Sequence, residues 1–261
     1  MPAASIRRSA LALVLAATSA LTHAQQAPST YTPEVFQAGK DVVWVPTPQT
    51  LVDRMLDMAK VTKDDFVMDL GSGDGRTVIT AAKRGARALG IEYNPDMVAL
   101  SRRNAEKEGV SGKANFVKAD LFETDFSKAS VITMFLLPDI NVKLRPKILG
   151  LKPGTRIVSN TFTMGDWDAD EKATLSPEAG CNTSWCTALL WIVPANAAGT
   201  HKLPHGEVTL KQQYQVLTGT VSTEGKTFVV EGGKVRGDEV SFSAGGKAYR
   251  GKMNGKALEL N

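Results

Sequence analysis

The sequence predicts an α/β fold in which a doubly wound parallel sheet is followed by a small C-terminal antiparallel β appendage. Short apolar runs alternate with helical patterns between residues 47 and 162, which is the order that a parallel sheet with crossover helices requires. A glycine-rich turn at residues 71–75 joins the first apolar run to a helical pattern. After Pro194 the helical period ends, and short alternating runs separated by glycines begin, so we expect tight hairpins there.

Each element of the expected sheet comes from an apolar run or from an apolar helical face. Pro95 is suited to a first helical turn, and Gly150 and Pro153 end a helix. In chain order we expect a helix from residue 47, a strand at 66–70, a helix after Gly75, a strand at 88–92, a helix from Pro95 to about residue 108, strands at 114–118 and 129–137, a helix at 143–149 and a strand at 156–162.

The appendage is expected to be a meander. Its predicted strands are residues 207–217, 228–231, 239–243 and 247–251. The first of them is a candidate to pair with residues 188–193 and so to complete the larger sheet. An Arg-Gly-Asp tripeptide at residues 236–238 is interpreted as a hairpin turn.

The N-terminus is typical of a secretory signal. Arg7 and Arg8 precede an apolar run at residues 10–21, and Ala24 offers a small-residue cleavage site. An uncleaved anchor is the alternative, but the run is short for a membrane span. We therefore predict a signal peptide at residues 1–24, a polar arm at 25–40, a catalytic domain at 41–195, the appendage at 196–261, and a periplasmic or secreted location.

The charge of the chain is too mild to indicate a polyanionic partner. The net charge of +4 falls to +2 when cleavage after Ala24 removes two arginines and no acids. Basic residues are also interleaved with acidic ones. We therefore expect neither nucleic acid as a partner nor a stable membrane span after signal cleavage.

The two cysteines, Cys181 and Cys186, are close in sequence. In an oxidising compartment we expect them to form one small-loop disulfide. A metal site needs more ligands than two thiols, and no histidine pair lies nearby at ligand spacing. We therefore predict no metal.

The glycine-rich turn carries acids that decide between cofactors. The segment DLGSGDGR at residues 69–76 has Arg76 where a dinucleotide-binding turn has its third glycine. Asp69 and Asp74 would repel a pyrophosphate. S-adenosylmethionine has no phosphate and carries a sulfonium and an ammonium, so an acidic turn suits it. A nicotinamide-dependent oxidoreductase is accordingly the weaker hypothesis.

These motifs resemble those of the class I S-adenosylmethionine-dependent methyltransferases. DLGSGDG at 69–75 matches their first motif, GIEYNP at 90–95 the second, and Asp120 the acid after the third strand. VPTPQ at 45–49, FLLPD at 135–139 and LKPGTR at 151–156 narrow the resemblance to the lysine methyltransferases of the ATP synthase c subunit and, more distantly, to DOT1-like histone methyltransferases. The resemblance covers roughly residues 42–167 and implies a Rossmann-like methyltransferase sheet.

The resemblance also implies a cofactor site. Glu92 would accept hydrogen bonds from the ribose hydroxyls, Asp69 would orient the glycine turn or the methionyl amine, and Asp120 would border the adenine. Exposed surface acids are the alternative for Glu92 and Asp120. The predicted cofactor residues are Asp69, Gly71, Ser72, Gly73, Asp74, Gly75, Glu92, Asp120 and Leu121.

The methyl acceptor is less well determined. Candidate substrate-side residues are Pro46, Thr47, Leu137, Pro138 and Asp139, with Asn160, Asp166 and Trp167 as further candidates. For Trp167, ordinary packing is an equal alternative. No catalytic base is evident, because FLLP at 135–138 replaces the Asn/Asp-Pro-Pro-Tyr motif of many amino methyltransferases.

The function that follows is methyl transfer from S-adenosylmethionine to nitrogen, by resemblance to a protein lysine. Export conflicts with this function, since S-adenosylmethionine is made in the cytoplasm. The alternative is an exported non-catalytic binding protein that reuses the pocket for an adenosine-type ligand. The intact set of Asp69, Glu92 and Asp120 with the three glycines argues against loss of the site.

Overall fold

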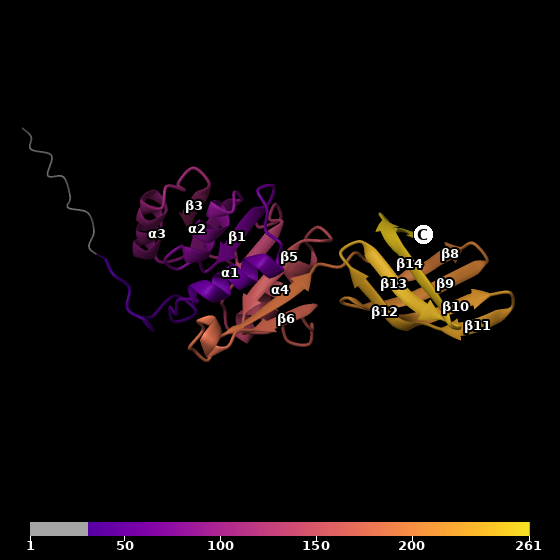
Figure 1. Cartoon of the computed structure of the whole chain (residues 1–261). Helices are drawn as coiled ribbons and strands as arrows, with labels where there is room; N and C mark the ends of the chain where they lie inside the picture. Colours follow the sequence, from indigo (N-terminus) through magenta and orange to yellow (C-terminus); the bar gives the residue numbers. More distant parts are fainter. Residues whose placement is uncertain (1–30, 261) are drawn as a thin grey trace, which may run out of the picture. The chain divides into compact units, whose positions relative to one another are not determined.

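Two β-sheets, formed one after the other along the chain, organise residues 31–260, which are the residues that this computed structural model describes (Figure 1). The predicted signal peptide at 1–24 and the start of the predicted arm at 25–40 lie outside the described residues. Within residues 31–260, no helix combines the length and the apolarity needed to cross a membrane.

The first sheet is a mixed α/β sheet with the strand order β3-β2-β1-β4-β5-β7-β6. The five strands from β3 to β5 are parallel, whereas β7 runs antiparallel to both β5 and β6. Its strands are β1 (Phe66–Leu70), β2 (Arg87–Glu92), β3 (Ala114–Lys118), β4 (Val131–Met134), β5 (Arg156–Asn160), β6 (Glu171–Thr174) and β7 (Thr187–Ile192).

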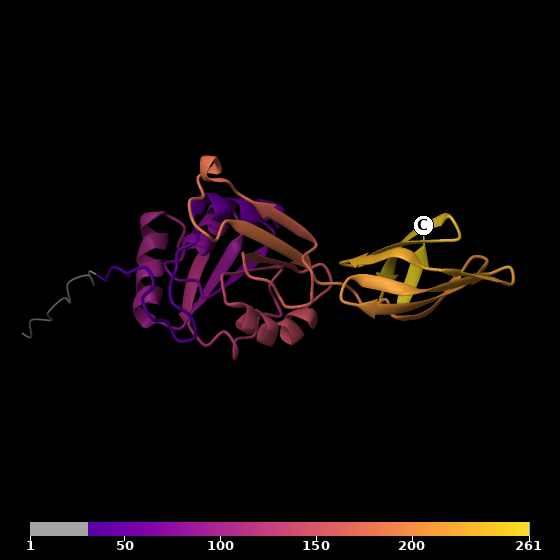
Figure 2. The ribbon, with the colours of Figure 1, turned by 90° about the horizontal axis from the view of Figure 1, so that it is seen from below.

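Helices cover both faces of this sheet, as Figure 2 shows with α4 on the opposite side from α1 and α2. Alternate residues of a strand face opposite sides, so Val67 packs with α1, α2 and α3 whereas Met68 packs with α4. The N-cap Asn94 begins α3 by accepting hydrogen bonds from the amides of Asp96 and Met97. The helices are α1 (Gln49–Met58), α2 (Arg76–Lys83), α3 (Pro95–Lys107), α4 (Pro138–Leu149) and the short 3-10 helix η1 (Pro177–Ala179).

The antiparallel end of the sheet corrects one expectation. Residues 207–217 are a candidate partner for residues 188–193 on sequence grounds, but β7 instead pairs with β5 and with β6. Little in the sequence indicates β6, because its four residues EKAT are exposed or half-buried. This short edge strand has no alternation of apolar and polar residues that would predict it. Its formation therefore depends on pairing with the neighbouring strand.

The segment after β4 also differs from its predicted bounds. The strand expected at 129–137 ends at Met134, and the helix expected at 143–149 begins at Pro138. Proline lacks an amide hydrogen, which the first turn of a helix does not need, so Pro138 starts α4. Residues 135–137 consequently form the connection at the carboxyl end of the sheet, where ligands bind in folds of this type.

The second sheet is antiparallel, with the strand order β15-β14-β13-β12-β10-β9-β8 and with β11 paired to β10. Tyr214, at a φ of 52°, turns the chain between β9 and β10, so the strand predicted at 207–217 is two strands. Val208, Leu217, Val240 and Phe242 belong to its separate core. Its strands are β8 (Gly199–Leu203), β9 (Gly206–Gln213), β10 (Val216–Thr223), β11 (Lys226–Val229), β12 (Glu231–Arg236), β13 (Glu239–Ala244), β14 (Lys247–Asn254) and β15 (Ala257–Leu260).

Candidate active site

The turn from β1 to α2 is built on Gly71, Gly73 and Gly75, with φ angles of 78°, 53° and 84°. Glycine adopts such left-handed angles at little cost. A Cβ atom on Gly73 would also lie only 2.5 Å from Nε1 of Trp44. Because these glycines have no side chain, the backbone of the turn can lie close to Trp44 and can also lie close to a ligand. The hydroxyl of Ser72 is buried and has no hydrogen-bond partner among the described residues.

Glu92 ends β2 beside this turn. Its two carboxylate oxygens accept hydrogen bonds from the backbone amides of Gly73 and Asn94, each at 2.9 Å. These bonds fix the carboxylate, and each oxygen keeps a lone pair for another donor. Glu92 is thus pre-oriented to accept hydrogen bonds from a pair of neighbouring hydroxyls, such as those of a ribose.

Asp69 lies on β1, and its carboxylate accepts a hydrogen bond of 2.6 Å from the hydroxyl of Thr133 on β4. Burial is the main reason that the pKa of Asp69 is raised to about 7; the charges of Glu92 and Asp74 contribute to the rise, and the hydroxyls of Thr133 and Thr77 act against it. A cation bound nearby would favour the ionised form. A positively charged ligand would therefore reduce the free-energy penalty of ionising the buried Asp69 carboxyl.

Asp74, predicted to bind the cofactor, is engaged by a neighbouring side chain. Arg76 donates to its carboxylate from Nε at 3.0 Å and from Nη2 at 2.6 Å. The same guanidinium donates from Nη1 to the backbone carbonyl of Thr47 at 2.9 Å. The pair therefore joins the glycine turn to the chain that precedes α1.

Asp120 follows β3 and accepts a hydrogen bond from the amide of Phe122 at 2.9 Å. Its other oxygen lies 3.0 Å from Nζ of Lys40. The hydrogen bond from Phe122 is the main reason that the pKa of Asp120 is lowered, and Lys40 lowers it further. Asp120 is therefore ionised, with its position set from two sides.

Residues 36–47, which we name the N-terminal strap, form one side of the cavity. Backbone hydrogen bonds fold the strap on itself, from the amide of Phe36 to the carbonyl of Trp44 and from the amide of Trp44 to the carbonyl of Gln37. The sequence predicts a polar arm at residues 25–40, and from the strap only Pro46 and Thr47 are predicted site residues. The apolar sequence VVWV at 42–45 was the available signal for the rest.

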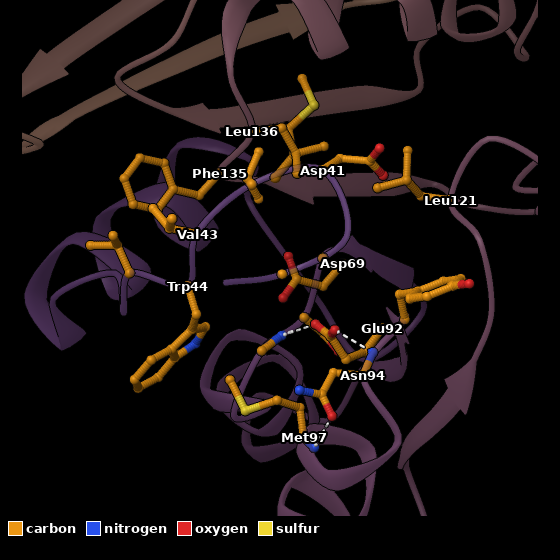
Figure 3. A pocket seen from close by; sticks show the side chains of 18 of the residues that line it. Asp41, Val43, Trp44, Asp69, Glu92, Asn94, Met97, Leu121, Phe135 and Leu136 are labelled. Atoms are coloured by element: carbon orange, nitrogen blue, oxygen red, sulfur yellow. Dashed lines mark hydrogen bonds between the residues drawn. The ribbon is translucent and has the colours of Figure 1, made fainter. Parts of the chain in front are cut away.

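The predicted cofactor residues converge on one cavity, as Figure 3 shows for Asp69, Glu92 and Leu121. Gly75 is the exception, because it caps α2 and faces Phe116 and Ser101. Of the substrate-side candidates, Pro46, Thr47 and Leu137 line the cavity, whereas Pro138 and Asp139 lie outside it on the exposed first turn of α4. Which of these residues bind cofactor or acceptor stays a prediction.

The three further substrate-side candidates lie outside the cavity lining. Trp167 is fully buried, packs against Trp191, and stacks on Tyr214 at 5.8 Å between ring centroids. Asp166 pairs with Arg145 and with the hydroxyl of Tyr214. Asn160 is buried and donates to the Thr47 hydroxyl at 3.3 Å. The packing alternative for Trp167 is therefore the one that the structure favours.

Comparisons with known proteins agree with this geometry. Residues 69–171 match the ANTKMT methyltransferase domain. A protein-lysine N-methyltransferase of Saccharolobus islandicus is 50% identical over 133 residues, which cover 50% of this chain and 83% of the relative. The chain belongs to the ANTKMT methyltransferase family.

Other relatives of this methyltransferase are more distant or differently named. The human lysine N-methyltransferase of the ATP synthase c subunit is 36% identical over 128 residues, which cover 49% of this chain and 54% of the relative. The chain thus spans about half the length of that relative. A crystal structure described as an RNA methyltransferase from Salinibacter ruber, in complex with S-adenosyl-L-homocysteine, is also similar to this chain. The two chains are 45% identical in sequence with a TM-score of 0.53, and the matched region covers 58% of this chain and 95% of the other.

This methyltransferase uses S-adenosylmethionine. Two side chains of the cavity fit that cofactor. The Glu92 carboxylate is oriented to accept hydrogen bonds from paired hydroxyls, and the buried Asp69 carboxyl favours a cation nearby. Asp74 and Asp120 already hold the two cations that line the cavity, Arg76 and Lys40. The matched domain ends at residue 171, so the loop between Cys181 and Cys186 lies beyond it.

Proposed function

We propose that this methyltransferase methylates the ε-amine of lysine side chains in proteins. The charge of the cavity carries the proposal. Its acidic lining residues outnumber the basic ones by five to two, namely Asp41, Asp69, Asp74, Glu92 and Asp120 against Lys40 and Arg76. A cavity of this sign attracts a lysine ammonium and repels the phosphates of RNA.

The end of the cavity away from Glu92 supports an aliphatic acceptor. Phe135 and Leu136 lie on the opposite side of Asp69 from Glu92 in the view of Figure 3, and Leu137 lines the same cavity with 46% of its surface exposed. Apolar surroundings lower the pKa of an ammonium by penalising its charge. An acceptor lysine would therefore lose its proton to solvent as it enters, which compensates for the lack of an evident base.

Methyl transfer mainly requires that the acceptor nitrogen be aligned with the methyl group and the sulfur of the donor. S-adenosylmethionine supplies a methyl group already activated by its sulfonium. The amine nitrogen forms the new bond to the methyl carbon as the carbon–sulfur bond breaks, and the methylated ammonium can then release a proton. Glu92 and the glycine turn hold the donor, and the apolar end positions the amine and excludes water.

The names of the relatives support two acceptor classes, protein lysine and RNA. Protein lysine is favoured because the cavity is acidic and because basic residues are interleaved with acidic ones along the chain. A base acceptor would also need hydrogen-bonding partners for its edges, whereas residues 135–137 offer the apolar side chains FLL.

Radiolabelled methyl transfer tests the proposal. The purified protein is incubated with methyl-labelled S-adenosylmethionine and either heat-treated total protein, the same protein after its lysines have been blocked by reductive dimethylation, or total RNA. We expect label in the untreated protein and its loss after blocking. Glu92→Ala is the control for cofactor dependence. Label in RNA, or label that survives the blocking, would contradict the proposal. Binding of the cofactor without any transfer would favour the non-catalytic alternative.

We further propose that the protein is exported. The signal-like segment with Arg7, Arg8 and Ala24 supports this, and so does the disulfide between Cys181 and Cys186, since disulfides persist in oxidising compartments. Expression of the full chain in a Gram-negative host, followed by fractionation and N-terminal sequencing, tests it. We expect a periplasmic product that begins at Gln25. A cytoplasmic product that retains its first residues would rule export out.

A further inference from the structure

Aromatic side chains gather at the apolar end of the cavity. Trp185 lies edge-on to Phe36 and to Phe135, with ring centroids 6.4 Å and 6.0 Å apart. Phe135 in turn stacks on Phe162 at 5.7 Å. All of these rings line the cavity that also contains Glu92 and the glycine turn. They come from four segments that are distant in sequence, so only the folded chain brings them together.

These rings are not an ordinary part of the core. Phe36 exposes 60% of its surface, and the other three rings are half-buried. Val43 and Leu137, with 50% and 46% exposed, extend the apolar surface along the same cavity. Exposed aromatic surface beside a cavity is typical of a binding site rather than of packing.

A disulfide fixes the position of Trp185. The bond between Cys181 and Cys186 closes a short loop, and both cysteines are buried although Trp185 is not. Inside the loop, the amide of Trp185 donates to the Thr183 hydroxyl at 3.1 Å. Cys186 directly precedes β7, so the loop is anchored to the sheet. The carbonyl of Gly180 accepts a hydrogen bond from Thr50 on α1 at 3.2 Å, which anchors its other end.

We propose that Trp185, held by the disulfide loop, forms with Phe36 and Phe135 an aromatic wall that receives the side chain of the acceptor lysine. The inference rests on the proposed function and specifies its acceptor site. Aromatic faces attract ammonium groups, and they pack well against an aliphatic stem. Methylation leaves the positive charge in place, so the same wall can hold a partly methylated lysine for a further transfer.

The donor end of the cavity makes a lysine the suitable occupant. Glu92 lies on the far side of Asp69 from Phe135 in the view of Figure 3, so an amine that passes along the wall would move toward the part of the cavity where we propose that the cofactor binds. A lysine side chain is long, unbranched and cationic at its tip. It can thus be attracted as an ammonium by the acidic cavity, contact the rings with its stem, and present its nitrogen as a neutral amine once the apolar end has lowered its pKa.

Separate measurements of acceptor and cofactor binding test the wall. The probe is heat-treated total protein as acceptor, titrated at saturating labelled S-adenosylmethionine, with cofactor affinity measured by calorimetry. For Trp185→Ala we expect the half-saturating acceptor concentration to rise by roughly tenfold, with cofactor affinity within about twofold of wild type. Trp185→Phe keeps an aromatic ring and should recover most of the loss.

Two further variants separate positioning from general damage. Cys181→Ser with Cys186→Ser frees the loop and should raise the half-saturating acceptor concentration as Trp185→Ala does. Tyr249→Ala removes a half-buried ring on β14, outside the cavity lining, and should leave that concentration unchanged. Thermal melting checks that each variant is folded.

The outcomes distinguish this inference from the proposed function. Labelling of lysine by wild type, together with unchanged acceptor saturation in a folded Trp185→Ala, overturns the wall alone. An equal loss of acceptor and cofactor affinity in Trp185→Ala and in Trp185→Phe also overturns it, because the residue would then only support the fold. Failure of wild type to label lysine at all would instead overturn the proposed function.

Discussion

Nζ of Lys40 lies 3.0 Å from a carboxylate oxygen of Asp120, and this ion pair ties the N-terminal strap to the loop after β3. Lys40 also lies over the rings of Tyr93 and Phe122, at 5.4 Å and 5.6 Å from their centroids. The strap and the loop after β3 border the same cavity. We therefore expect the ion pair to hold the strap closed over the bound cofactor, and we expect salt to weaken this contact.

Lys40→Met should loosen the strap. The methionine keeps an apolar stem but loses the ion pair, so we expect faster release of S-adenosylhomocysteine in stopped-flow experiments and little change in melting temperature. The difference from wild type should shrink at high salt, because wild type then loses the same attraction. Lys63→Met is the control, since Lys63 pairs with Asp64 on an exposed surface away from the cavity lining. Equal release rates at low salt would contradict the prediction.

Glu92→Ala should weaken cofactor binding strongly. The variant removes the acceptor for paired hydroxyls and leaves the amides of Gly73 and Asn94 without their partner. We expect a loss of about 2–4 kcal/mol of binding free energy by calorimetry. Glu108→Ala, which removes a surface partner of Lys83, serves as the control. A loss in Glu92→Ala no larger than in this control would show that the carboxylate does not hold the cofactor.

Gly73→Ala should disturb both the glycine turn and the strap. The new Cβ atom would lie 2.5 Å from Nε1 of Trp44, at a φ of 53° that L-residues rarely adopt. We expect weaker cofactor binding, partly restored by adding Trp44→Ala, which removes the clash but not the backbone strain. Gly109→Ala is the matched control, because Gly109 has a φ of 68° and open space around it. Absence of any recovery in the double variant would show that Trp44 is not the obstacle.

Asp69 should make the stability of the cofactor-free protein depend on pH. Its pKa is raised from 3.8 to about 7 on folding, so between these values the folded protein binds more protons than the unfolded chain. The free energy of unfolding should therefore fall as pH rises through this window, by at most about 1.4 kcal/mol per pH unit from this group. Above the folded pKa the full cost of the buried charge is present.

Urea unfolding at about pH 5 and about pH 8 checks this sign. Asp69→Asn keeps an acceptor for Thr133 and removes the charge, so we expect its advantage over wild type to be larger at the higher pH. Comparing the two proteins cancels the titration of other groups. A wild type that gains stability relative to Asp69→Asn as pH rises would contradict the raised pKa.

Local patterns predicted that residues from several strand ends would meet at one cavity, whereas their binding of the cofactor stays a prediction. The glycine turn and Asp120 follow strands of the parallel part of the sheet, and Glu92 is the last residue of β2; the carboxyl ends of such strands meet at one edge. The position of each of these residues at the end of a predicted strand is therefore enough to predict that they lie close together. The position of Trp185 has no such signal, because it depends on β7 pairing between β5 and β6. The contact of the strap with the glycine turn was equally hidden, since Trp44 and Gly73 meet only in the folded chain.

By itself, the sequence determined the alternation of strands and helices and, through the motifs DLGSGDG and GIEYNP, the resemblance to methyltransferases, because periodicity and motifs are local properties of consecutive residues. Only the tertiary structure decided which side chains face the cavity. It placed Asp74 on Arg76, Lys40 on Asp120 and Trp167 in the core. Charge pairing and burial depend on neighbours that are distant along the chain, and folding alone brings those neighbours together.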